Sequence, residues 1–364
     1  MGRRDIDPLF AVKKQRSFKG LIITLLVVLM LSVSVALVNA FINRQVQTVS
    51  LSVTIPSLPS SLQGFRILHI SDLHGSRFGK GQEGISAAIN NLKYDMVVLS
   101  GDMTAPDGSF DGLTELLDVI GGKAPVFLVS GDEDPTAIQS KAHISNQVKA
   151  EYVLAAEKRG AVYLDAPYQM TVGKATLWIC PGTVYSTDSD AEMHNTQYNL
   201  DLLEKMPQTE DTEAAKRALQ YWIDRLNRTS EALSLMKSTD MKICVTHVPY
   251  TSASITELMY EAEGNVLRNN ATPVSLVLAG HYNSGQCCLP GIGPVYLPAE
   301  LGVYPDNAWF PGGKGLSGLN TIRGITQHIS PGLGSAGIYA PLKWRFFNSP
   351  AVSLLTLTSK LVSQ

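Results

Sequence analysis

Carboxylate and imidazole side chains gather in short polar clusters along this chain, and each cluster follows an apolar run. The candidate ligands in these clusters are Asp72, His74, Asp102, Asp132, His247 and His281. Hydrolysis of a phosphate ester by two divalent ions needs such oxygen and imidazole ligands, with one carboxylate shared between ions that lie about 3.5–4 Å apart. The ordered set therefore predicts a centre for two divalent ions, of manganese, magnesium, iron or zinc.

Each motif is weak evidence by itself, because Asp-x-His is common and a Gly-Asp pair after a strand is often a turn. A lone histidine at the end of a strand is more often structural than a ligand. An isolated acidic triplet such as Asp132-Glu133-Asp134, directly before Pro135, would be a solvated turn. The triplet follows the third apolar run in register with the other clusters, and this position favours Asp132 alone as a ligand.

The apolar runs before the clusters have the length and composition of strands that are buried on both faces. These runs are Arg66–Ile70, Met96–Leu99, Val126–Val129, Lys242–Val245 and Val274–Leu278. Because α/β folds place their sites at the carboxyl ends of their strands, the clusters are expected to meet at one edge of a sheet. Closing strands are expected near Ile322–Ser330 and Ala351–Thr358.

The N-terminal region predicts a membrane anchor. Residues 21–42 form an uncharged, strongly apolar run, and about 20 such residues cross the hydrocarbon layer as a helix. The basic residues before this run are Arg3, Arg4, Lys13, Lys14, Arg16 and Lys19, against only Asp5 and Asp7. The positive-inside rule therefore places residues 1–20 in the cytoplasm and the catalytic domain on the extracytoplasmic side of the cell membrane.

A cleavable signal peptide is the competing interpretation, because Val38-Asn39-Ala40 resembles a small-residue cleavage site. The apolar run is longer than the usual core of a signal peptide, which favours an anchor. The sequence has no second run of comparable length, so it predicts a single-pass protein.

Composition excludes several other classes of protein. The formal net charge of −2 over 364 residues predicts no nucleic-acid partner. Four cysteines are too few for a disulfide framework in a chain this long. Cys180 and Cys244 lie in apolar runs and are interpreted as core residues, although a disulfide remains open for a domain outside the cytoplasm.

The rest of the chain divides into three parts. Residues 43–64 predict a short strand and a linker, and residues 65–360 the catalytic domain. Within that domain, residues 185–237 predict a helical insertion, with amphipathic helices over Asp201–Met206 and Glu213–Met236. This insertion is either a surface helix pair that packs on the sheet or an element that shapes access for a substrate.

The ordered motifs resemble the calcineurin-like metallophosphoesterase family over about residues 64–360. The matching segments are Asp72-Leu73-His74, Gly101-Asp102, Gly131-Asp132-Glu133-Asp134, His247 and Gly280-His281-Tyr282-Asn283-Ser284-Gly285-Gln286. The family has Asp-x-His, Gly-Asp, Gly-Asn-His-Glu/Asp, a lone His and Gly-His-x-His-x-Gly-Gln at these places. With the closing segment Ser330-Pro331-Gly332-Leu333-Gly334, the chain is most similar to a membrane-associated bacterial branch that includes YkuE-like and UDP-diacylglucosamine pyrophosphatase-like proteins.

The resemblance implies an α/β fold, a four-layer αββα sandwich with an N-terminal transmembrane helix and a helical insertion. It implies that Asp72 and His74 hold the first ion and that Asp102 bridges to the second. Asp132, His247 and His281 complete the second site. A metal-bound hydroxide then attacks the phosphorus of a phosphate ester or pyrophosphate.

The chain departs from the family motifs at three positions. Asp132 replaces an amide ligand and adds negative charge. Asn283 replaces an imidazole on the first ion, and an amide oxygen favours Mn²⁺, Mg²⁺ or Ca²⁺ over zinc-like ions. Glu133 stands at the family's catalytic histidine, and it acts as a general acid only if its pKa is raised. Like charges beside Glu133 would raise this pKa, and nearby metal ions would oppose the rise.

Two functions remain open at this stage. The first is a hydrolase for a phosphorylated small molecule, a lipid head group or a cell-envelope component, with Arg77, Tyr282 and Gln286 in contact with the substrate. The second is a weakened or inactive descendant that keeps the site as a metal- or ligand-binding module.

Overall fold

The computed structural model describes residues 18–142, 147–186, 188–252, 254–255, 274–339 and 344–359. The chain falls into two compact units, Met1–Ile42 and Asn43–Gln364. Helix α1 (Phe18–Arg44) is the single helix among the described residues that is long and apolar enough to cross a membrane. Three hydroxyl side chains are satisfied within the helix, since those of Thr24, Ser32 and Ser34 donate to carbonyls four residues earlier.

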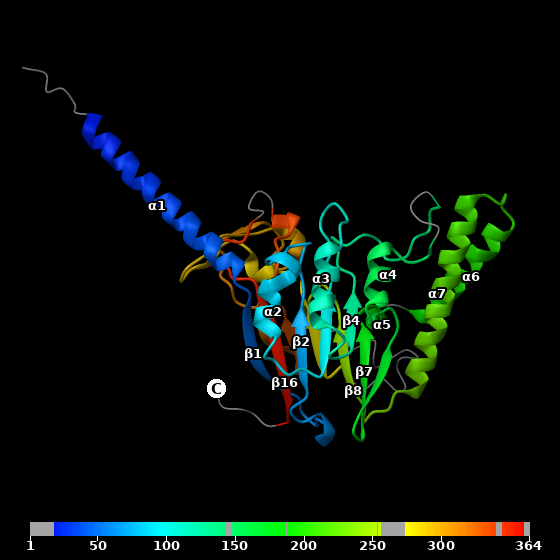
Figure 1. The fold of residues 1–364 in the computed structure, drawn as a ribbon. Helices are drawn as coiled ribbons and strands as arrows, with labels where there is room; N and C mark the ends of the chain where they lie inside the picture. Colours follow the sequence, from blue (N-terminus) through cyan, green and yellow to red (C-terminus); the bar gives the residue numbers. More distant parts are fainter. Residues whose placement is uncertain are drawn as a thin grey trace, which may run out of the picture. The chain divides into compact units, whose positions relative to one another are not determined.

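The second unit contains two six-stranded sheets, and the first carries the N-terminal clusters (Figure 1). Its strands, in spatial order, are β1 (Gln47–Thr54), β16 (Ala351–Thr358), β2 (Arg66–Ile70), β3 (Met96–Ser100), β4 (Val126–Val129) and β5 (Ala161–Tyr163). Strands β2 to β5 are parallel, so their carboxyl ends share one edge. The segment 43–64, predicted as a linker with a short strand, supplies edge strand β1, which runs parallel to β16.

The second sheet carries the two C-terminal histidine clusters. Its strands, in spatial order, are β14 (Gly318–Ile322), β15 (Ile325–Ile329), β9 (Leu276–Ala279), β8 (Met241–Val245), β7 (Ala175–Pro181) and β6 (Tyr168–Val172). Strands β15, β9, β8 and β7 are parallel, and the two edge strands are antiparallel to their neighbours. The carboxyl ends of β8 and β9 therefore also meet at one edge.

The main core lies between the two sheets, because alternate residues of each strand point into it. From the first sheet it contains Ile67, Met96, Val98, Phe127, Leu355 and Leu357. From the second sheet it contains Leu177, Ile179, Met241, Ile243, Val245, Leu276 and Leu278. This continuous core makes the two sheets the inner layers of a sandwich.

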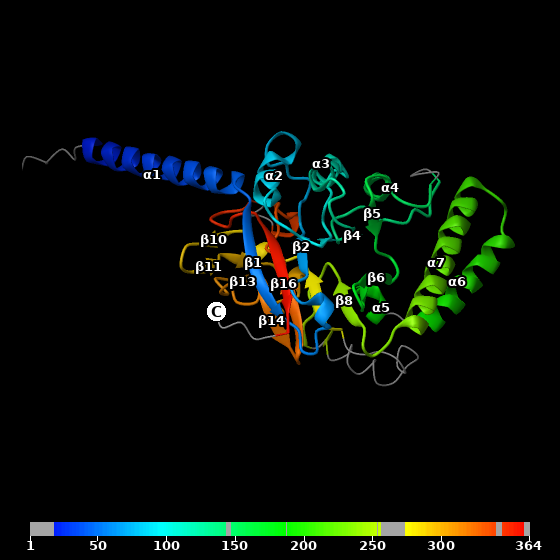
Figure 2. The ribbon, with the colours of Figure 1, turned by 60° about the horizontal axis from the view of Figure 1, so that its bottom comes forward.

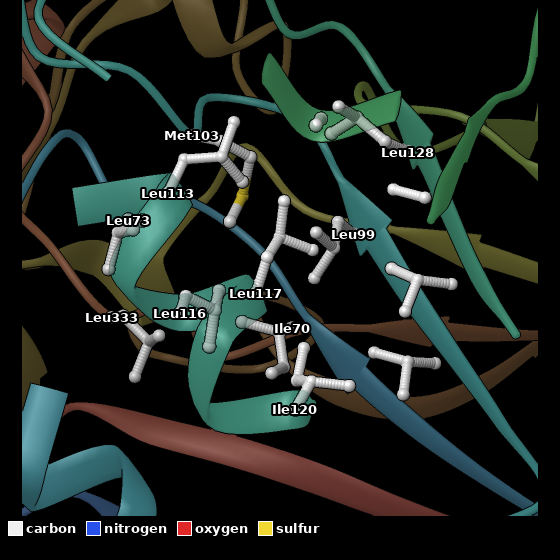
Figure 3. Packing of buried hydrophobic residues seen from close by; sticks show 14 of the residues in the cluster. Ile70, Leu73, Leu99, Met103, Leu113, Leu116, Leu117, Ile120, Leu128 and Leu333 are labelled. Carbon is white, nitrogen blue, oxygen red and sulfur yellow. The ribbon is translucent and has the colours of Figure 1, made fainter. Parts of the chain in front are cut away.

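Three helices cover the outer face of the first sheet: α2 (Glu83–Ile89), α3 (Asp111–Ile120) and α4 (Glu151–Lys158) (Figures 1 and 2). Helix α3 buries Leu113, Leu116, Leu117 and Ile120 against the apolar side chains of β2, β3 and β4 (Figure 3). These four positions follow the three- and four-residue spacing of one helix face. The helix ends at Gly121, whose left-handed conformation closes its C-terminus.

The region predicted as a helical insertion forms α5 (Thr183–Ser186), α6 (Ser189–Glu204) and α7 (Glu210–Leu235), and α6 and α7 run side by side (Figures 1 and 2). Ala232 of α7 packs with Trp178 and Cys180 on the outer face of β7. Helix α6 begins well before the predicted segment 201–206. Its first turns have no apolar stripe, but the Asp188 carboxylate accepts from the first backbone amides and starts the helix.

The layers confirm the predicted fold class, a four-layer α/β sandwich with helices on both outer faces and one N-terminal apolar helix. All seven strands expected from the apolar runs are present, with ends that differ by a few residues. The remaining short strands are β10 (Cys288–Leu289), β11 (Gly293–Pro294), β12 (Tyr296–Leu297) and β13 (Ala308–Trp309). Single 3₁₀ turns occur at Ser60–Leu62, Lys80–Gln82, Asn283–Gly285, Ala299–Leu301 and Gly337–Tyr339. The four cysteines, all among the described residues, are free.

Candidate metal centre

The loops after β2 and β3 bring together a first group of ligands. Side-chain ligand atoms of Asp72, His74 and Asp102 lie within 4.8 Å of one another, and all three residues are buried. Backbone hydrogen bonds continue the strand pairing into these loops, since Asp72 N donates to Gly101 O at 3.0 Å and His74 N to Asp102 O at 2.9 Å. The pairing of two parallel strands thus sets the spacing of the three side chains.

The loops after β4, β8 and β9 bring together a second group. Its members Asp132, His247 and His281 likewise offer ligand atoms within 4.8 Å of one another. Asp132 Oδ1 lies 3.2 Å from His247 Nε2, and Asp132 Oδ2 lies 3.1 Å from His281 Nδ1. The two histidines are buried, whereas the Asp132 side chain is 47% exposed, so the second group is open to solvent on its acidic side.

Asp102 connects the two groups. Its Oδ2 lies 3.1 Å from His247 Nε2 and 3.7 Å from His74 Nε2, so one carboxylate oxygen faces a histidine of each group. Its Oδ1 accepts from the backbone amide of Glu133 at 2.8 Å, which fixes the plane of the carboxylate. This is the position that a bridging ligand between two ions would need.

Apolar residues between the ligands anchor these loops in the core. Leu73 lies between the two ligands of the first loop, Met103 follows Asp102, and Leu333 belongs to the closing segment; all three pack near Leu113 of α3 (Figure 3). Several ligand residues adopt a left-handed backbone conformation in these loops, which is uncommon and strained for residues other than glycine. Positive φ occurs at Asp72 (53°), His74 (45°), Asp102 (54°), His281 (74°) and Asn283 (46°).

Two glycines allow ligands to approach the backbone of a neighbouring loop. A Cβ atom on Gly131 would lie 2.1 Å from Asp102 Oδ1, and one on Gly280 would lie 2.7 Å from Asp72 Oδ2. Both distances are shorter than any van der Waals contact. Gly131 and Gly280, which begin their motifs, therefore provide room for the carboxylates of Asp102 and Asp72 from neighbouring loops.

A backbone contact determines which nitrogen of His247 faces the centre. Nδ1 lies 2.8 Å from the carbonyl oxygen of Ser100, which accepts hydrogen bonds and donates none. Nδ1 therefore carries a hydrogen, and Nε2 is the nitrogen that points toward Asp102 and Asp132. This is the usual outer-shell arrangement of a histidine that binds a metal.

The charges in this cluster favour cations. Burial raises the pKa of Asp72, and the charge of Asp102 adds to the rise, although His247 and His74 oppose it. Burial alone would lower the pKa of His247, but the hydrogen bond with Asp102 and the surrounding carboxylates raise it to about 10. When ionised, the carboxylates of Asp72, Asp102, Asp132 and Glu133 carry one negative charge each, and together they would balance the positive charge of two divalent ions. The donor set and its charge thus fit two such ions.

Glu133, predicted as the catalytic residue, lies beside the first group. Its Oε2 lies 3.2 Å from His74 Nδ1, and its Oε1 accepts from the backbone amide of Gly337 at 3.0 Å and that of Ile338 at 3.3 Å. The interaction with His74 lowers the pKa of Glu133, although partial burial opposes this shift. The carboxylate is therefore held in its ionised form and orients the His74 ring.

Asn283 lies next to His74, and its side-chain amide is bound on the other side by Arg345, a residue outside the motifs. Asn283 Oδ1 accepts from Arg345 Nη1 at 3.2 Å, and Asn283 Nδ2 lies 3.5 Å from His74 Nε2. Arg345 is only 4% exposed, and burial lowers its pKa to about 10, so its guanidinium remains charged at neutral pH.

Asp134 has a structural role that the motif did not reveal. Its Oδ1 accepts from the backbone amides of Met103 and Thr104 at 2.9 and 2.8 Å, and its Oδ2 accepts from Gly131 N at 2.9 Å. It therefore joins the loop after β3 to the loop after β4. A solvated turn residue would not make these contacts. The sequence around Asp134 contains no pattern that distinguishes it from a solvated turn residue.

The three residues predicted to contact a substrate have other partners in this structure. Arg77 forms ion pairs with Asp111 and Glu115 of α3 at 3.1 and 3.0 Å. Gln286 is fully buried, and its side-chain amide exchanges hydrogen bonds with the backbone of Ala336. Tyr282 is buried with its ring 5.7 Å from that of His281. The Tyr282 ring thus lies beside a candidate ligand, and the roles of all three residues toward a substrate stay predictions.

Comparisons with known proteins found similar chains. A transmembrane protein with a metallophosphoesterase domain from Danio rerio is 29% identical over 123 residues, which cover 32% of this chain and 27% of that protein. The chain thus spans about a quarter of the length of that relative. The crystal structure of a phosphopantetheinyl hydrolase from Mycobacterium tuberculosis is similar over 74% of this chain and 89% of that one, with 15% identity and a TM-score of 0.37.

The family comparison covers the strands and loops that build the centre. The model of the calcineurin-like phosphoesterase family matches residues 65–283, which is more than half of the chain and includes both groups of ligands. This chain therefore belongs to the calcineurin-like phosphoesterase family.

Proposed function

We propose that this protein is a membrane-anchored, metal-dependent phosphoesterase that cleaves a phosphate ester or pyrophosphate bond on the extracytoplasmic side. The observation that carries the proposal is the position of Asp102, whose Oδ2 faces a histidine of each ligand group. Family membership and the apolar helix α1 support it.

We assign the first ion to Asp72, His74 and the shared Asp102; Asn283, which the motif predicts as a further ligand, lies beside His74. The second ion is assigned to Asp132, His247, His281 and the same Asp102. Two bound divalent ions would supply positive charge for the phosphate oxygens and lower the pKa of water at the site. The substrate would enter beside Asp132, the most exposed of these ligands.

The protein's own groups hold this centre in place. Ser100 O and Glu133 fix the rings of His247 and His74 from behind, and the backbone amide of Glu133 fixes Asp102. A role for Glu133 as general acid requires a proton, and its lowered pKa disfavours one at neutral pH. Glu133 therefore serves best as a positioning residue for His74.

The nature of the substrate follows from the chemistry and the anchor. A phosphorylated small molecule, a lipid head group and a cell-envelope component all present a phosphate that two ions could hold. The branch of YkuE-like and UDP-diacylglucosamine pyrophosphatase-like proteins remains the proposed placement within the family. The basic residues before the apolar run 21–42 support the proposed location of the domain outside the cytoplasm, under the positive-inside rule.

A specific observation favours a second candidate function, that of a metal- or ligand-binding module with weak or no turnover. The oxygen of the Asn283 amide faces Arg345, and the nitrogen faces His74. The first group then offers an ion fewer ligands than the family pattern provides, and a poorly held ion would reduce turnover.

Turnover by the full-length chain in detergent separates the two candidates. The protein would be loaded separately with Mn²⁺, Mg²⁺ and Zn²⁺ and assayed with nitrophenyl phosphate and bis-nitrophenyl phosphate. We expect metal-dependent hydrolysis that Asp102→Asn abolishes and that Asp107→Asn, an exposed loop substitution, leaves unchanged. Two bound ions per chain without turnover of either ester would favour the binding module.

The proposed orientation has its own test. An epitope tag at the C-terminus should be accessible to protease in intact cells, while a tag at the N-terminus should be protected. Protection of both tags would contradict an extracytoplasmic domain. Loss of the N-terminal tag from the mature chain would instead show cleavage of a signal peptide, for which Val38-Asn39-Ala40 is the candidate site.

A further inference from the structure

The orientation of the Asn283 amide is determined by its partner on the outer side. Arg345 Nη1 lies 3.2 Å from the amide atom that faces it, and a guanidinium donates hydrogen bonds but accepts none. The facing atom must therefore be the oxygen. The amide nitrogen, which has no lone pair for a metal ion, is then directed at His74 Nε2, 3.5 Å away.

The guanidinium itself has little freedom to move. Nη1 also donates to Gly334 O at 2.8 Å, Nη2 donates to Pro331 O at 2.9 Å, and Nε donates to Asn348 O at 3.1 Å. Arg345 is 4% exposed, so water does not compete for these contacts. The bonds tie the guanidinium to the backbone of the closing segment.

Asn283 is equally confined. The backbone carbonyl of Asn283 accepts from Asn348 Nδ2 at 2.9 Å, and the backbone of Asn283 is left-handed, with a φ of 46°. A Cβ atom on Gly332 would lie 2.5 Å from Asn283 Oδ1, so the closing segment leaves just enough room for the amide oxygen. Rotating the amide by half a turn would place Asn283 Nδ2 against Arg345 Nη1, and both groups are donors. The buried oxygen Oδ1 would then lose its hydrogen bond from Arg345.

We propose that Arg345 is a positioning residue that turns the amide oxygen of Asn283 away from the metal centre. The inference rests on the proposed two-ion site and deepens it. The ion at the first group is held by Asp72, His74 and the shared Asp102, without Asn283. The ion at the second group has four protein ligands, namely Asp102, Asp132, His247 and His281. The two ions therefore bind with different affinities, and the first is the weaker.

Arg345 adds an electrostatic reason for the same inequality. Its buried positive charge lies on the side of the first group, hydrogen-bonded to a residue that contacts His74. A cation in a poorly solvated environment repels another cation more strongly than it would in water. The charge of Arg345 therefore repels an ion at the first group more strongly than an ion at the second group.

An isosteric pair of variants tests this proposal. In Asn283→Asp, one carboxylate oxygen keeps the contact with Arg345, and the other stands where the amide nitrogen now faces His74. In Asn283→Ala, both contacts are removed. The full-length chain in detergent would be freed of metal with a chelator and titrated with Mn²⁺ by calorimetry, with metal analysis of the bound ions. Asn90→Asp, at the exposed end of α2, is the control for an added charge.

We expect two classes of Mn²⁺ site in the wild type. The weaker dissociation constant should change less than threefold in Asn283→Ala, because the amide is not a ligand, and should tighten at least tenfold in Asn283→Asp. A wild type with one ion and an Asn283→Asp variant with two would also support the proposal. Tenfold weakening in Asn283→Ala, with an unchanged melting temperature, would overturn it by showing that the amide oxygen is a ligand. An unaltered weaker site in Asn283→Asp would overturn it as well.

The variant Arg345→Met gives an independent readout where it folds. Without the guanidinium the amide of Asn283 is free to turn, and the weaker Mn²⁺ constant should tighten. All these readouts are binding constants rather than rates. A protein that binds two unequal ions without hydrolysing any ester would therefore contradict the proposed hydrolase while supporting the role of Arg345.

Discussion

His74 Nδ1 lies 3.2 Å from Glu133 Oε2, and the other nitrogen of the ring faces the metal centre. Glu133 is held in turn by the backbone amide of Gly337 at 3.0 Å. The residue that replaces the family's catalytic histidine thus connects the first ligand loop to the closing segment. An ionised carboxylate behind a ligand histidine orients the ring and raises its basicity.

Removal of the Glu133 carboxylate should therefore weaken the first ion. We expect Glu133→Ala to raise the Mn²⁺ dissociation constant of that ion about 10- to 100-fold, the usual cost of losing an outer-shell partner of a ligand. Glu133→Gln keeps an acceptor for His74 and should lose less than about tenfold. Calorimetric titration of the chelated full-length chain measures both.

Dependence on the leaving group distinguishes this role from general acid catalysis. A nitrophenolate leaves without a proton, whereas an alkoxide needs one. For a positioning residue, Glu133→Gln should slow nitrophenyl and alkyl phosphate esters by the same factor. A much larger loss with the alkyl ester would instead identify Glu133 as the acid.

Close approach at Gly131 leads to a second prediction. A Cβ at this position would lie 2.1 Å from Asp102 Oδ1, so Gly131→Ala must displace the bridging carboxylate or the loop after β4. We expect it to lower the bound metal to less than one ion per chain and to reduce stability by about 1–3 kcal/mol. Gly313→Ala is the control, because its added Cβ would be 3.4 Å from the nearest atom, Pro294 Cδ. Equal metal contents in the two variants would contradict the prediction.

The loss of Asp134 gives a third prediction. Its carboxylate accepts from Met103 N, Thr104 N and Gly131 N, so Asp134→Ala leaves several donors of two ligand loops without a partner. We expect the free energy of unfolding to fall by about 2–3 kcal/mol. Urea denaturation measures it, with Asp107→Ala in an exposed turn as the control. A difference of less than about 0.5 kcal/mol between the variants would argue against the bridging role.

The strands and ligand clusters could be predicted because their signals are local. Runs such as Val126–Val129 are short and continuously apolar, and each ends in a polar cluster. Parallel pairing then forces the clusters to one edge, so the order of the motifs along the chain already contained the approximate geometry of the centre. Leu73 shows why this works, since its apolar side chain fixes the loop while its neighbours face the site.

The remaining features depend on contacts between distant segments. Arg345 approaches Asn283 from 62 residues further along the chain, and nothing in its immediate neighbours indicates a partner. Similarly, β1 joins the sheet through β16, more than 300 residues away, so its segment resembles a linker when taken alone. Helix α6 depends on the Asp188 cap rather than on an apolar stripe.

The raised pKa of His247 predicts how the metal-free protein responds to alkali. Burial opposes its charge, but Asp102 and its neighbours raise the pKa to about 10, above the value of about 6.5 in an unfolded chain. A raised pKa contributes stability that is complete below about pH 6.5 and is lost as pH rises toward 10. The chelated protein should therefore lose up to about 1.4 kcal/mol per pH unit within this window.

Metal binding should suppress that loss, because a ligand histidine is already neutral. Melting temperatures of the chelated and Mn²⁺-loaded protein between pH 7 and 9 test the difference. His247→Gln should reduce the slope of the chelated form. Parallel slopes in the chelated and loaded wild type would show that His247 does not carry a proton in the metal-free fold.

A buried histidine pair between the two sheets predicts the opposite response to acid. His69 Nδ1 lies 2.8 Å from His328 Nδ1, and His69 Nε2 lies 2.8 Å from Ser100 Oγ. Burial, followed by the charge of His328, lowers the pKa of His69 well below its ordinary value, and burial lowers the pKa of His328 to about 3. Both rings are therefore neutral in the folded protein and accept protons on unfolding. Lowered pKa values give stability that is present above about pH 6.5 and lost as pH falls below it.

Urea denaturation of the chelated protein at pH 7, 6 and 5 tests this pair. We expect each histidine to contribute a loss that approaches about 1.4 kcal/mol per pH unit, because the unfolded chain binds a proton that the folded chain excludes. The raised pKa of His247 adds nothing in this window, since its contribution is already complete below pH 6.5. His328→Gln should lower the slope of unfolding free energy against pH by up to about 1.4 kcal/mol per pH unit, the effect of one proton. His194→Gln, on the exposed side of α6, is the control and should leave the slope unchanged. If both variants keep the wild-type slope, the acid response arises elsewhere, and the pair between β2 and β15 does not exclude protons from the core.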